Sequence, residues 1–356
     1  MAAGKSTRTH PLTTTRPKPL VPLWDRPLLE HQLLQLDGLV DEALLVVGFL
    51  REQIEERFGD RFGGIRLRYV VQEQQRGTAD ALLAARPHIT ARCLVLNGDD
   101  FYHGDDLRGL AARGRGLLVN RAKDPENRAV VRMEGDAIRG IEEKPKNPPR
   151  DAWCSVGGYC VEKDDLRFLD EITPSPRGEL ELPDFILRLV EMSDVRAKRI
   201  ERFWLPITYS WDVLQTALFL WQNPERAREL GLAAEPFRGA QGPVHRGSNV
   251  QIEEGARLEG PIAIGSGVRI AAGATVERSI LFDDVLVGER AHVSDSVLGK
   301  GVSIGASARI ESRPGAELVI DVKGKKVIPD IARLGAVLGD GVSIEARAVV
   351  PAGTLI

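Results

Sequence analysis

The sequence has few cysteines, few aromatic residues and no long hydrophobic run. Its three cysteines, Cys93, Cys154 and Cys160, show no Cys-x-x-Cys spacing, and the odd number favours reduced thiols in a cytoplasmic protein. No apolar stretch approaches the ~20 residues that a membrane span needs, and a signal peptide is not expected. The formal net charge is only −3 and no basic run occurs, so neither nucleic acid nor a membrane is expected as a partner.

The first residues contain part of a phosphate-loop motif without the rest of that motif. Gly4 begins the letters GKST, which end the Walker A pattern, but the first glycine of the pattern would lie before Met1. A Walker A loop also continues into a helix, whereas Pro11 and two further prolines follow here and would break one. An ATPase of the phosphate-loop type is therefore not expected.

A turn of small residues followed by two cations remains at the N-terminus. Arg8 and Lys18 belong to an extended segment that contains several prolines. Backbone amides satisfy phosphate oxygens while Arg and Lys offset their charge, so this combination suits a triphosphate. The apolar residues that follow, such as Leu20 and Val21, argue against a disordered terminus.

Short apolar runs alternate with helical patterns up to about residue 221. Residues 42–49, 67–72 and 93–99 are expected to be buried strands, with helical spacing between them. This alternation predicts a parallel sheet covered on both faces. Ligands of such sheets bind beyond the carboxyl ends of the strands, and Asp99 lies at one of these ends. Asp99 is therefore a candidate carboxylate for contact with a ligand.

The last third of the chain follows a period of six residues. This period predicts a β-solenoid with aliphatic side chains stacked inside, because an amphipathic helix would repeat at about 3.6 residues. Residues 311–333 interrupt the repeat and are expected to project as a loop or hairpin, whereas residues 222–245 are expected to be a linker with a short helix. The repeat positions are Ile252, Leu258, Ile264, Ile270, Val276, Val287, Val293, Leu298, Ile304, Ile310, Leu338, Ile344 and Val350.

Seven segments, in this order, resemble the sugar-phosphate nucleotidylyltransferases that carry a C-terminal left-handed β-helix. They are AAGKSTRTHPLTTTRPKPLVPL, QEQQRGTADAL, VLNGDD, IEEKPKNP, SVGGY, RGELELPDFI and ITYSWDVL. The resemblance covers nearly the whole chain. It implies an α/β fold: a Rossmann-like nucleotidyltransferase domain with a mixed, mainly parallel sheet over residues 1–221, the linker over 222–245, and a left-handed parallel β-helix over 246–356.

The resemblance implies that an NTP and a sugar 1-phosphate react to give an NDP-sugar and pyrophosphate. A sugar-phosphate oxygen attacks the α-phosphorus in line, so two anions must be brought together. UTP or dTTP with a glucose-type sugar is the expected pair, although no motif determines the base or the sugar. Mg²⁺ is the expected cofactor, and the β-helix is expected to serve assembly into a homo-oligomer.

The resemblance also implies a role for each matching residue. Arg8 would hold the leaving pyrophosphate, Lys18 would hold the α-phosphate, and Asp99 would bind Mg²⁺. Glu143 would accept hydrogen bonds from sugar hydroxyls, and Lys144 would neutralise the sugar phosphate. The other expected nucleotide-binding residues are Ala3, Gly4, Ser6, Thr7, Gln72, Gly77 and Thr78, and the other expected sugar-phosphate-binding residues are Ser155 and Gly157.

Two departures from the family pattern concern the N-terminal turn. Family members carry a β-strand immediately before this turn, whereas the present chain starts inside it, so we expect the true start to lie upstream of Met1. A sheet without a central strand would leave two neighbouring strands with unpaired edges. The usual second glycine of the turn is Ser6, whose small side chain can still hydrogen-bond to phosphate.

Two further departures concern the sugar and the metal. The family's Tyr-Gly pair appears as Arg128 and Ala129, and its asparagine appears as Ser155, which leaves the identity of the sugar open. The family's Trp-x-Asp-x-Gly segment appears as WLPIT, with Pro206 in place of the second magnesium ligand. The ion would then depend on Asp99, substrate phosphates and water.

Two alternative functions remain open. Ser155 and Pro206 also suit a catalytically impaired paralogue that binds sugar nucleotides and regulates a partner. Some relatives have an acyltransferase site in the β-helix, which needs a general base such as histidine; His292 is the one histidine of residues 246–356, at a position expected to be structural. Asp212 lies close to Pro206 in sequence, but it is expected in the first turn of the next helix.

Overall fold

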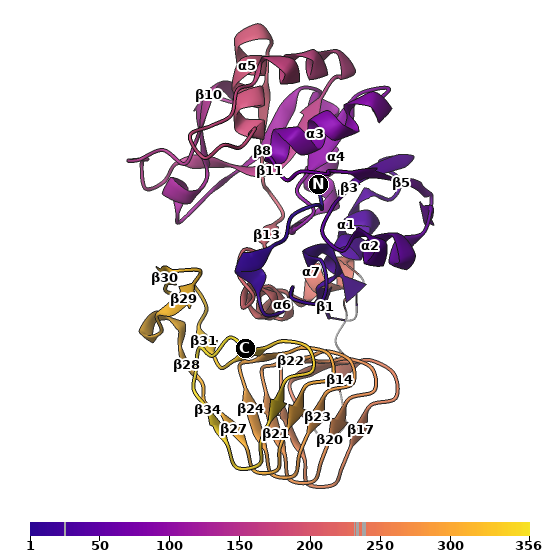
Figure 1. The fold of residues 1–356 in the computed structure, drawn as a ribbon, viewed down its shortest axis with the longest axis vertical. Helices are drawn as coiled ribbons and strands as arrows, with labels where there is room; N and C mark the ends of the chain where they lie inside the picture. The colour runs from indigo at the N-terminus through magenta and orange to yellow at the C-terminus, as the bar shows by residue number, and fades with distance from the viewer. Residues whose placement is uncertain (25, 231, 233–234, 237–239) are drawn as a thin grey trace. The chain divides into compact units, whose positions relative to one another are not determined.

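The computed structural model describes residues 1–24, 26–230, 232, 235–236 and 240–356, which divide into two compact units (Figure 1). The first unit contains Met1–Lys5 and Gln32–Leu205, and the second contains Ser6–His31 and Pro206–Ile356. The N-terminal segment 6–31 thus belongs to the same unit as the C-terminal repeats. Within the described residues, no helix combines the length and the hydrophobicity that a membrane crossing needs.

The first unit is built on two sheets with helices packed against them. Its strands are β3 (Glu42–Val47), β4 (Arg61–Phe62), β5 (Ile65–Val71), β6 (Cys93–Leu96), β7 (Asp100–Tyr102), β8 (Gly116–Arg121), β9 (Ala129–Glu134), β10 (Ala137–Glu143), β11 (Trp153–Val161) and β12 (Arg196–Arg199), and β13 (Trp204–Pro206) pairs with β7. The helices of the chain are α1 (Leu28–Leu36), α2 (Arg51–Phe58), α3 (Thr78–Ala85), α4 (Gly104–Arg113), α5 (Leu182–Met192), α6 (Asp212–Gln222) and α7 (Pro224–Glu229).

The strand order explains why the sheet is mixed. One sheet has the order β3-β5-β4 and the other has the order β6-β11-β8-β12-β10-β9. The predicted strands appear as β3, β5 and β6, and the helical patterns between them appear as α2 and α3. The expectation of a mainly parallel sheet is corrected, because only the β3–β5 and β8–β12 pairs are parallel among the registers described for these two sheets. The antiparallel pairs arise where consecutive strands such as β9 and β10 form hairpins.

The first three residues of the chain lie between β3 and β6. Ala2 forms a parallel bridge with Val47 and donates its backbone N–H to the carbonyl of Val46. On the other side, the Gly98 N–H donates to the carbonyl of Met1 at 2.7 Å. These contacts connect the two sheets at the carboxyl ends of β3 and β6, where the N-terminal turn begins.

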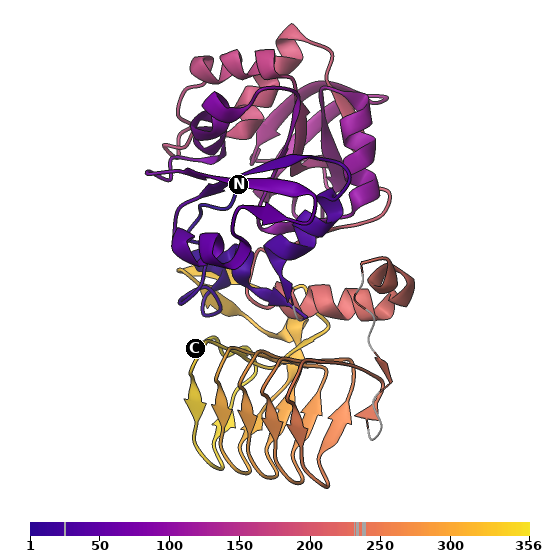
Figure 2. The same ribbon diagram turned by 90° about the vertical axis from the view of Figure 1, so that its right-hand side faces the viewer.

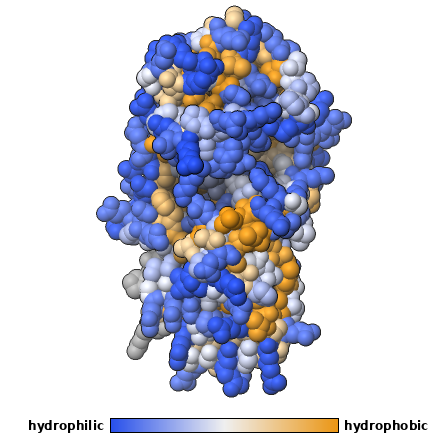
Figure 3. Space-filling model, turned by 90° about the vertical axis from the view of Figure 1, so that its left-hand side faces the viewer, coloured by the Kyte–Doolittle hydropathy of each residue, from blue (hydrophilic) through white to orange (hydrophobic). Residues whose placement is uncertain are grey.

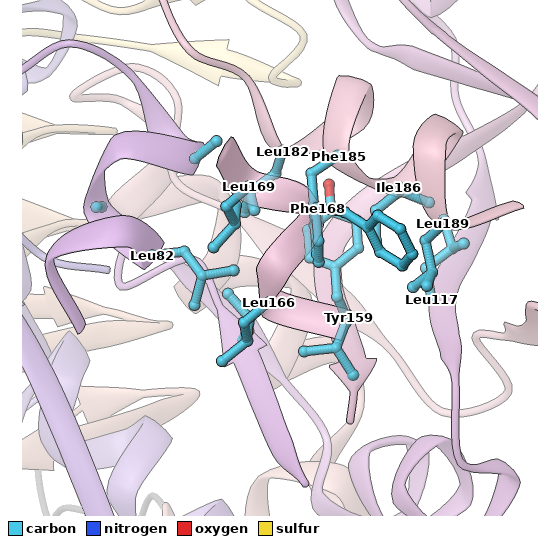
Figure 4. Close-up of a cluster of buried hydrophobic side chains, with 14 of the residues drawn as sticks. Leu82, Leu117, Tyr159, Leu166, Phe168, Leu169, Leu182, Phe185, Ile186 and Leu189 are labelled. Carbon is cyan, nitrogen blue, oxygen red and sulfur yellow. The ribbon is translucent and has the colours of Figure 1, made fainter. Parts of the chain in front are cut away.

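The hydrophobic core of the first unit lies between the large sheet and its helices. Helix α5 begins with a proline in its first turn, which suits a helix start, and places Leu182, Phe185, Ile186 and Leu189 on one face through their i, i+3, i+4, i+7 spacing. Figure 4 shows these side chains packed with others from the 3₁₀ helix η5 (Lys163–Glu171), α3 and the sheet. This packing holds the strand ends that carry the candidate site.

The second unit contains the hexapeptide repeat as a parallel β-helix (Figure 2). Ile252 pairs with Ile270 one coil of 18 residues later, and Leu281 pairs with Leu298 one coil of 17 residues later. The inward side chains form one continuous aliphatic core, so the predicted repeat is confirmed. The strands of the coils are β15 (Ala240–Gln241), β16 (Pro243–Arg246), β17 (Gln251–Ile252), β18 (Arg257–Glu259), β19 (Ile262–Ile264), β20 (Arg269–Ile270), β21 (Thr275–Glu277), β22 (Ile280–Leu281), β23 (Leu286–Val287), β24 (His292–Ser294), β25 (Val297–Leu298), β26 (Ser303–Ile304), β27 (Arg309–Ile310), β32 (Val337–Leu338), β33 (Ser343–Ile344) and β34 (Val349–Val350).

The interruption of the repeat is a projecting arm. It contains β28 (Arg313–Pro314) paired with β31 (Arg333–Leu334), and an antiparallel hairpin of β29 (Ile320–Val322) and β30 (Lys325–Val327). The predicted hairpin is therefore confirmed. The remaining strands of the second unit are β1 (Pro22–Leu23), β2 (Arg26–Pro27) and β14 (Glu235–Pro236).

The segment predicted to be a linker has structure at both of its ends. Helix α7 is the expected short helix, and β15 and β16 already pair with β18 and β19 of the β-helix. The part of this prediction that concerns residues 231, 233–234 and 237–239 lies outside the described residues. The exact domain boundaries stay predictions.

Candidate functional site

Two of the predicted nucleotide-binding residues meet at the carboxyl ends of β3 and β5. The Gln72 N–H, directly after β5, donates to the carbonyl of Val47 at the end of β3. The side-chain amide of Gln75 donates to the carbonyl of Ala3 at 2.6 Å. The first contact continues the parallel pairing of β3 and β5, which aligns their carboxyl ends. Ala3 and Gln72 thus lie at the carboxyl-terminal end of the strands of this sheet.

The side-chain amide of Gln72 has a defined orientation. Its Nε2 donates to the carbonyl of Gly77 at 3.1 Å and to Oδ2 of Asp80 at 2.8 Å. Both partners are acceptors only, so a flipped amide would place Oε1 against two other oxygens. Arg76 pairs with the other oxygen of Asp80 at 2.8 Å, so both carboxylate oxygens have a donor. The oxygen of Gln72 is the part of the amide left for a ligand.

Asp80 is a functional candidate that the sequence reasoning missed. It lies in the first turn of α3 and is only 6% exposed, which is unusual for an aspartate. The signal available in the sequence was the i, i+4 spacing of Arg76 and Asp80 within the segment that also carries Gln72. That spacing alone does not reveal which residue Asp80 contacts.

Gly77 and Thr78 fit their positions for different reasons. Gly77 has φ +115°, and a β-carbon there would clash with the carbonyl oxygen of Leu180. The hydroxyl of Thr78 accepts the N–H of Leu182 at 3.0 Å, while the Leu180 N–H donates to the carbonyl of Arg76 at 2.7 Å. The segment around Leu180 therefore fixes the loop that leads into α3, and only glycine fits beside it.

The two aspartates after β6 have different surroundings. Asp100 is buried, and its Oδ2 accepts hydrogen bonds from the Tyr102 hydroxyl and the Asn97 amide, both at 3.2 Å. Burial, followed by the negative charges of Asp100 and Asp99, raises the pKa of Tyr102, so its hydroxyl stays a donor. Asp99 lies in the turn between β6 and β7 and is partly exposed. Asp99 is therefore better placed than Asp100 to meet a ligand.

The donor set suits a magnesium ion held mostly by its substrate. Among the residues that the structure describes, no group of three or more His, Cys, Asp or Glu side chains is arranged to hold a metal. Mg²⁺ is commonly bound by one or two carboxylates together with phosphate oxygens and water. The carboxylate of Asp99 fits one of these positions. Asp212 does not, because it accepts the N–H groups of Thr208 and Tyr209 at the start of α6, as expected from the sequence.

The predicted sugar-phosphate residues Glu143 and Lys144 follow each other at the end of β10. Burial raises the pKa of the Glu143 carboxyl, against the opposing charge of Lys144. The Lys144 ammonium lies 3.4 Å from Glu143, and Arg177 lies 3.6 Å from it. Lys144 has φ +50° and donates its backbone N–H to the carbonyl of Arg128. A carboxylate with two adjacent cations can accept from hydroxyls while the cations bind a phosphate.

The predicted residues Ser155 and Gly157 lie at an irregularity in β11. The Ser155 hydroxyl bonds to the Tyr159 hydroxyl at 3.1 Å and accepts the N–H of Gly157 at 3.3 Å. Gly157 has φ +77°, and a β-carbon there would clash with the side chain of Asn97. The backbone N–H of Asn97 donates to the carbonyl of Gly157. This contact brings the loop of β11 beside the turn that carries Asp99.

The second unit carries the predicted turn residues Ser6 and Thr7 and the cations Arg8 and Lys18. Ser6 has φ +48°, and its carbonyl accepts the hydroxyls of Thr9 and Thr13 at 2.6 and 2.9 Å. These bonds close the turn around one carbonyl oxygen. Arg8 is exposed, whereas Lys18 is 4% exposed at the start of a short 3₁₀ helix.

The predicted site residues therefore fall into two groups. The structure brings Ala3, Gln72, Gly77 and Thr78 together, and links the Asp99 turn to Gly157 through Asn97. The group in the first unit comprises Ala3, Gly4, Gln72, Gly77, Thr78, Asp99, Glu143, Lys144, Ser155 and Gly157, and the group in the second unit comprises Ser6, Thr7, Arg8 and Lys18. The roles of these residues stay predictions.

Comparisons with known proteins place both parts of the chain in context. A family model described as nucleotidyl transferase matches residues 1–221, and a model described as GMPPB C-terminal domain matches residues 240–356. A solved structure of a UDP-glucose pyrophosphorylase complexed with UDP-glucose covers 62% of this chain and 97% of its own, with a TM-score of 0.57 and 19% identity. The predicted nucleotidyltransferase fold is thereby confirmed.

Two curated relatives match almost the whole chain. The protein named bifunctional protein GlmU of Methanococcus maripaludis strain C7 is 32% identical over 374 residues, which cover 96% of this chain and 87% of the relative. A protein of Sulfurisphaera tokodaii named bifunctional sugar-1-phosphate nucleotidylyltransferase/acetyltransferase is 26% identical over 365 residues, with coverage of 95% and 88%. At these coverages, both matches include most of the nucleotidyl transferase part of the chain and most of the β-helix.

Proposed function

The chain belongs to the nucleotidyl transferase family, and we propose that it joins an NTP to a sugar 1-phosphate, forming an NDP-sugar and releasing pyrophosphate. The observation that carries this proposal is the position of Ala3 and Gln72 at the carboxyl ends of β3 and β5, where Gln75 donates to the carbonyl of Ala3 and the Gln72 N–H donates to that of Val47. Ligands of α/β proteins bind beyond such strand ends. The names of the relatives support the same reaction.

The reaction is an in-line displacement at phosphorus. An oxygen of the sugar phosphate attacks the α-phosphorus of the NTP, the new P–O bond forms, and the bond to the β-phosphate oxygen breaks with its electron pair leaving on pyrophosphate. Lys18 neutralises the α-phosphate and Arg8 holds the pyrophosphate as it leaves. Asp99 would hold Mg²⁺, which supplies further neutralisation of phosphate charge when bound.

The orientation of Gln72 supports a base that carries an N–H donor. Uracil and thymine present such an N–H at the ring position where cytosine presents a bare nitrogen acceptor. Since Gln72 offers an oxygen beside Asp80 and Gly77, cytosine would bring two acceptors together. Guanine also carries a ring N–H, so this contact disfavours cytosine without separating guanine from uracil and thymine; among these bases we propose UTP or dTTP as the nucleotide class.

The sugar 1-phosphate is assigned to the strand ends of β10 and β11. The Glu143 carboxylate can accept a hydrogen bond from a sugar hydroxyl, and the adjacent Lys144 ammonium can bind the phosphate. Gly157 would contribute through its backbone alone, because the side chain of Asn97 fills the space where a β-carbon would lie. A glucose-type sugar is the class that we propose.

Pyrophosphate release tests the proposed reaction. We would incubate the full chain with Mg²⁺, UTP, dTTP, CTP or GTP, and the 1-phosphates of glucose, glucosamine, N-acetylglucosamine or mannose. Release should occur with one pair and fall by about 100-fold or more in Lys18→Ala and Asp99→Ala. The exposed residues Lys163 and Asp164 supply matched controls, whose alanine variants should stay within about twofold of the unchanged protein.

Base preference tests the role given to Gln72. UTP or dTTP should exceed CTP by about 100-fold in kcat/KM, because a buried acceptor pair is strongly unfavourable. Asp80→Asn should weaken this preference, since an asparagine can donate as well as accept and so permits the flipped amide. The exposed neighbour Glu73 gives the control Glu73→Gln, which should leave the preference unchanged. An unchanged preference in Asp80→Asn would reject the assignment.

Two other functions can be distinguished from the proposed reaction by further measurements. A regulatory paralogue, suggested by Pro206, would bind a sugar nucleotide in calorimetry without releasing pyrophosphate at any Mg²⁺ concentration. Acetyl transfer is the second, because a relative is named for it; His292 is the candidate base, with Nε2 at 2.7 Å from Ser294 and 3.2 Å from Glu277. Acetyl-CoA consumption with an amino-sugar 1-phosphate, lost in His292→Ala, would support it.

The β-helix also supports assembly of identical chains. Five of the seven large hydrophobic side chains that are exposed in the described residues lie in this part of the second unit, and hydrophobic colour interrupts the hydrophilic surface in Figure 3. Exposed apolar groups of this kind mark association surfaces. We assign a homo-oligomer to the protein, with residues 246–356 as the assembly domain and 1–221 as the catalytic domain. The five residues are Leu286, Val319, Ile328, Val349 and Ile356.

A further inference from the structure

The N-terminal segment of the second unit packs on one corner of the β-helix. A β-carbon built on Gly339 would lie 2.9 Å from the β-carbon of Pro11, so the two backbones approach closely. The guanidinium of Arg16 lies over the ring of Phe282, 5.2 Å from its centre. The N-terminal segment therefore contacts the corner of the solenoid at two places, through Pro11 at Gly339 and through Arg16 at Phe282.

Asp340 connects this corner to the N-terminal segment through one of its two oxygens. Oδ2 accepts the hydroxyl of Thr15 at 2.5 Å and also a guanidinium N–H of Arg16. Oδ1 accepts the backbone N–H of Lys300 at 2.8 Å. The side chains of Arg16 and Asp340 are 13% and 18% exposed, so solvent screens this ion pair only partly. Charge-assisted bonds between mostly buried groups are among the stronger polar contacts in proteins.

A comparison with Asp283 shows which hydrogen bonds of Asp340 are common to the solenoid corner and which are specific to Asp340. Asp283 occupies the same corner in an earlier coil, because Leu281, two residues before it, aligns through Leu298 with Leu338. Its Oδ1 accepts the N–H of Ser266 at 2.8 Å, which matches the bond from Lys300 to Asp340. The Oδ1 bond is therefore a feature of the solenoid corner. The Oδ2 bonds to Thr15 and Arg16 are what Asp340 adds.

We propose that Asp340 is a positioning residue for nucleotide binding, which acts by holding the segment between Arg8 and Lys18 against the β-helix. Thr15 and Arg16 lie between these two cations along the chain, and their bonds to Asp340 restrict the conformations that the segment can adopt. A restricted segment binds the triphosphate with a smaller loss of conformational entropy. The inference rests on the proposed function, because it takes Arg8 and Lys18 as the phosphate-binding residues.

The variant Asp340→Asn tests this role, with Asp283→Asn as its matched control. The asparagine can keep the bond from the Lys300 N–H but places an amide N–H₂ in front of Thr15 and Arg16. The KM for the NTP should rise about tenfold, while the KM for the sugar 1-phosphate, whose assigned residues are in the first unit, should stay unchanged. Asp283→Asn should alter neither constant.

Hydrogen exchange of residues 6–20 gives a readout that does not depend on catalysis. Exchange should accelerate in Asp340→Asn and stay unchanged in Asp283→Asn. The effects of Asp340→Asn and Arg16→Gln should add to less than their sum, because both remove the same ion pair while Arg16→Gln also removes the contact with Phe282. Unchanged exchange and an unchanged KM for the NTP in Asp340→Asn would overturn the inference. Equal increases in both KM values with faster exchange throughout the second unit would also overturn it, since they indicate a loss of structure.

If the unchanged protein releases no pyrophosphate with any substrate pair, the proposed function fails and the exchange comparison still decides whether Asp340 holds the segment. If it is active and Asp340→Asn changes neither the exchange of residues 6–20 nor the KM for the NTP, the proposed function stands and the role of Asp340 is rejected. The two failures are therefore distinguishable.

Discussion

The β-helix and the α/β unit reach their structures by different routes. In the β-helix, Leu298 pairs with Leu281 before it and with Leu338 after it, so each inward position repeats the contacts of its neighbours. In the α/β unit, each site residue is fixed by a different segment: Gln72 by Asp80, and Gly77 by Leu180. A substitution in the solenoid should thus affect stability, whereas one at a strand end of the α/β unit should affect a particular contact and the activity with it.

Gly77→Ala should have the largest effect and sharpens this contrast. Alanine must adopt a left-handed conformation there and meet the Leu180 carbonyl, for a combined loss of roughly 4 kcal/mol of unfolding free energy. Nucleotide turnover should fall as well, because Gln72 loses the Gly77 carbonyl as a fixed partner. Denaturant unfolding and pyrophosphate release measure the two effects. Gly178, with φ +77° and open space around it, is the control, and Gly178→Ala should lose only about 1 kcal/mol.

Ile304→Ala tests the other side of the comparison. Ile304 is buried between Val287 and Ile344 in successive coils, and its truncation should remove about 3 kcal/mol from the unfolding free energy. The KM values should not change, because no role in substrate binding is assigned to this part of the solenoid. Leu286, 44% exposed in the neighbouring strand β23, gives the control Leu286→Ala with an expected loss below about 0.5 kcal/mol. Equal losses in both variants would contradict the packing described for the coils.

The same difference explains how much of the molecule its sequence predicts. The period of six fixes which side chains face inward, and two apolar runs and a GD turn suffice to predict β3, β5 and the position of Asp99. The pairing of β8 with β12 was not predictable, since these strands are separated by three others in sequence. The hydrogen bond from Gln72 to Asp80 was not predictable either, because a local i, i+4 pattern does not show which amide donates to the carboxylate.

Acid should weaken the contact between Asp340 and the N-terminal segment. Burial alone would raise the pKa of Asp340, but the hydrogen bonds from Arg16 and Thr15 hold it below its usual value. A lowered folded pKa means that the carboxylate stabilises the fold above the unfolded value of about 3.9, and that this contribution is lost as the pH falls through the folded value. Asp340→Asn should therefore be less stable than the unchanged protein by about 2 kcal/mol at pH 7.

The pH series that checks this prediction runs from pH 7 to pH 3. The difference in unfolding free energy between the unchanged protein and Asp340→Asn should narrow below about pH 4. Asp283→Asn supplies the control, because it keeps both bonds from Arg16 and Thr15 to Asp340. A difference that stays constant down to pH 3 would show that the charge of Asp340 does not contribute.

Ser6→Gly should have the smallest effect on stability. Ser6 lies in the N-terminal turn, where the sequence passes from the first unit to the second. Ser6 holds φ +48°, a conformation that disfavours a residue with a β-carbon, and glycine relieves this strain while making the unfolded chain more flexible. The balance should raise the unfolding free energy by about 0.5 kcal/mol. Thr14 is exposed in the same segment without a positive φ, so Thr14→Gly should lower stability by a similar amount. Opposite signs in the two variants would establish that the left-handed backbone, rather than flexibility of the segment as a whole, determines what residue fits at position 6.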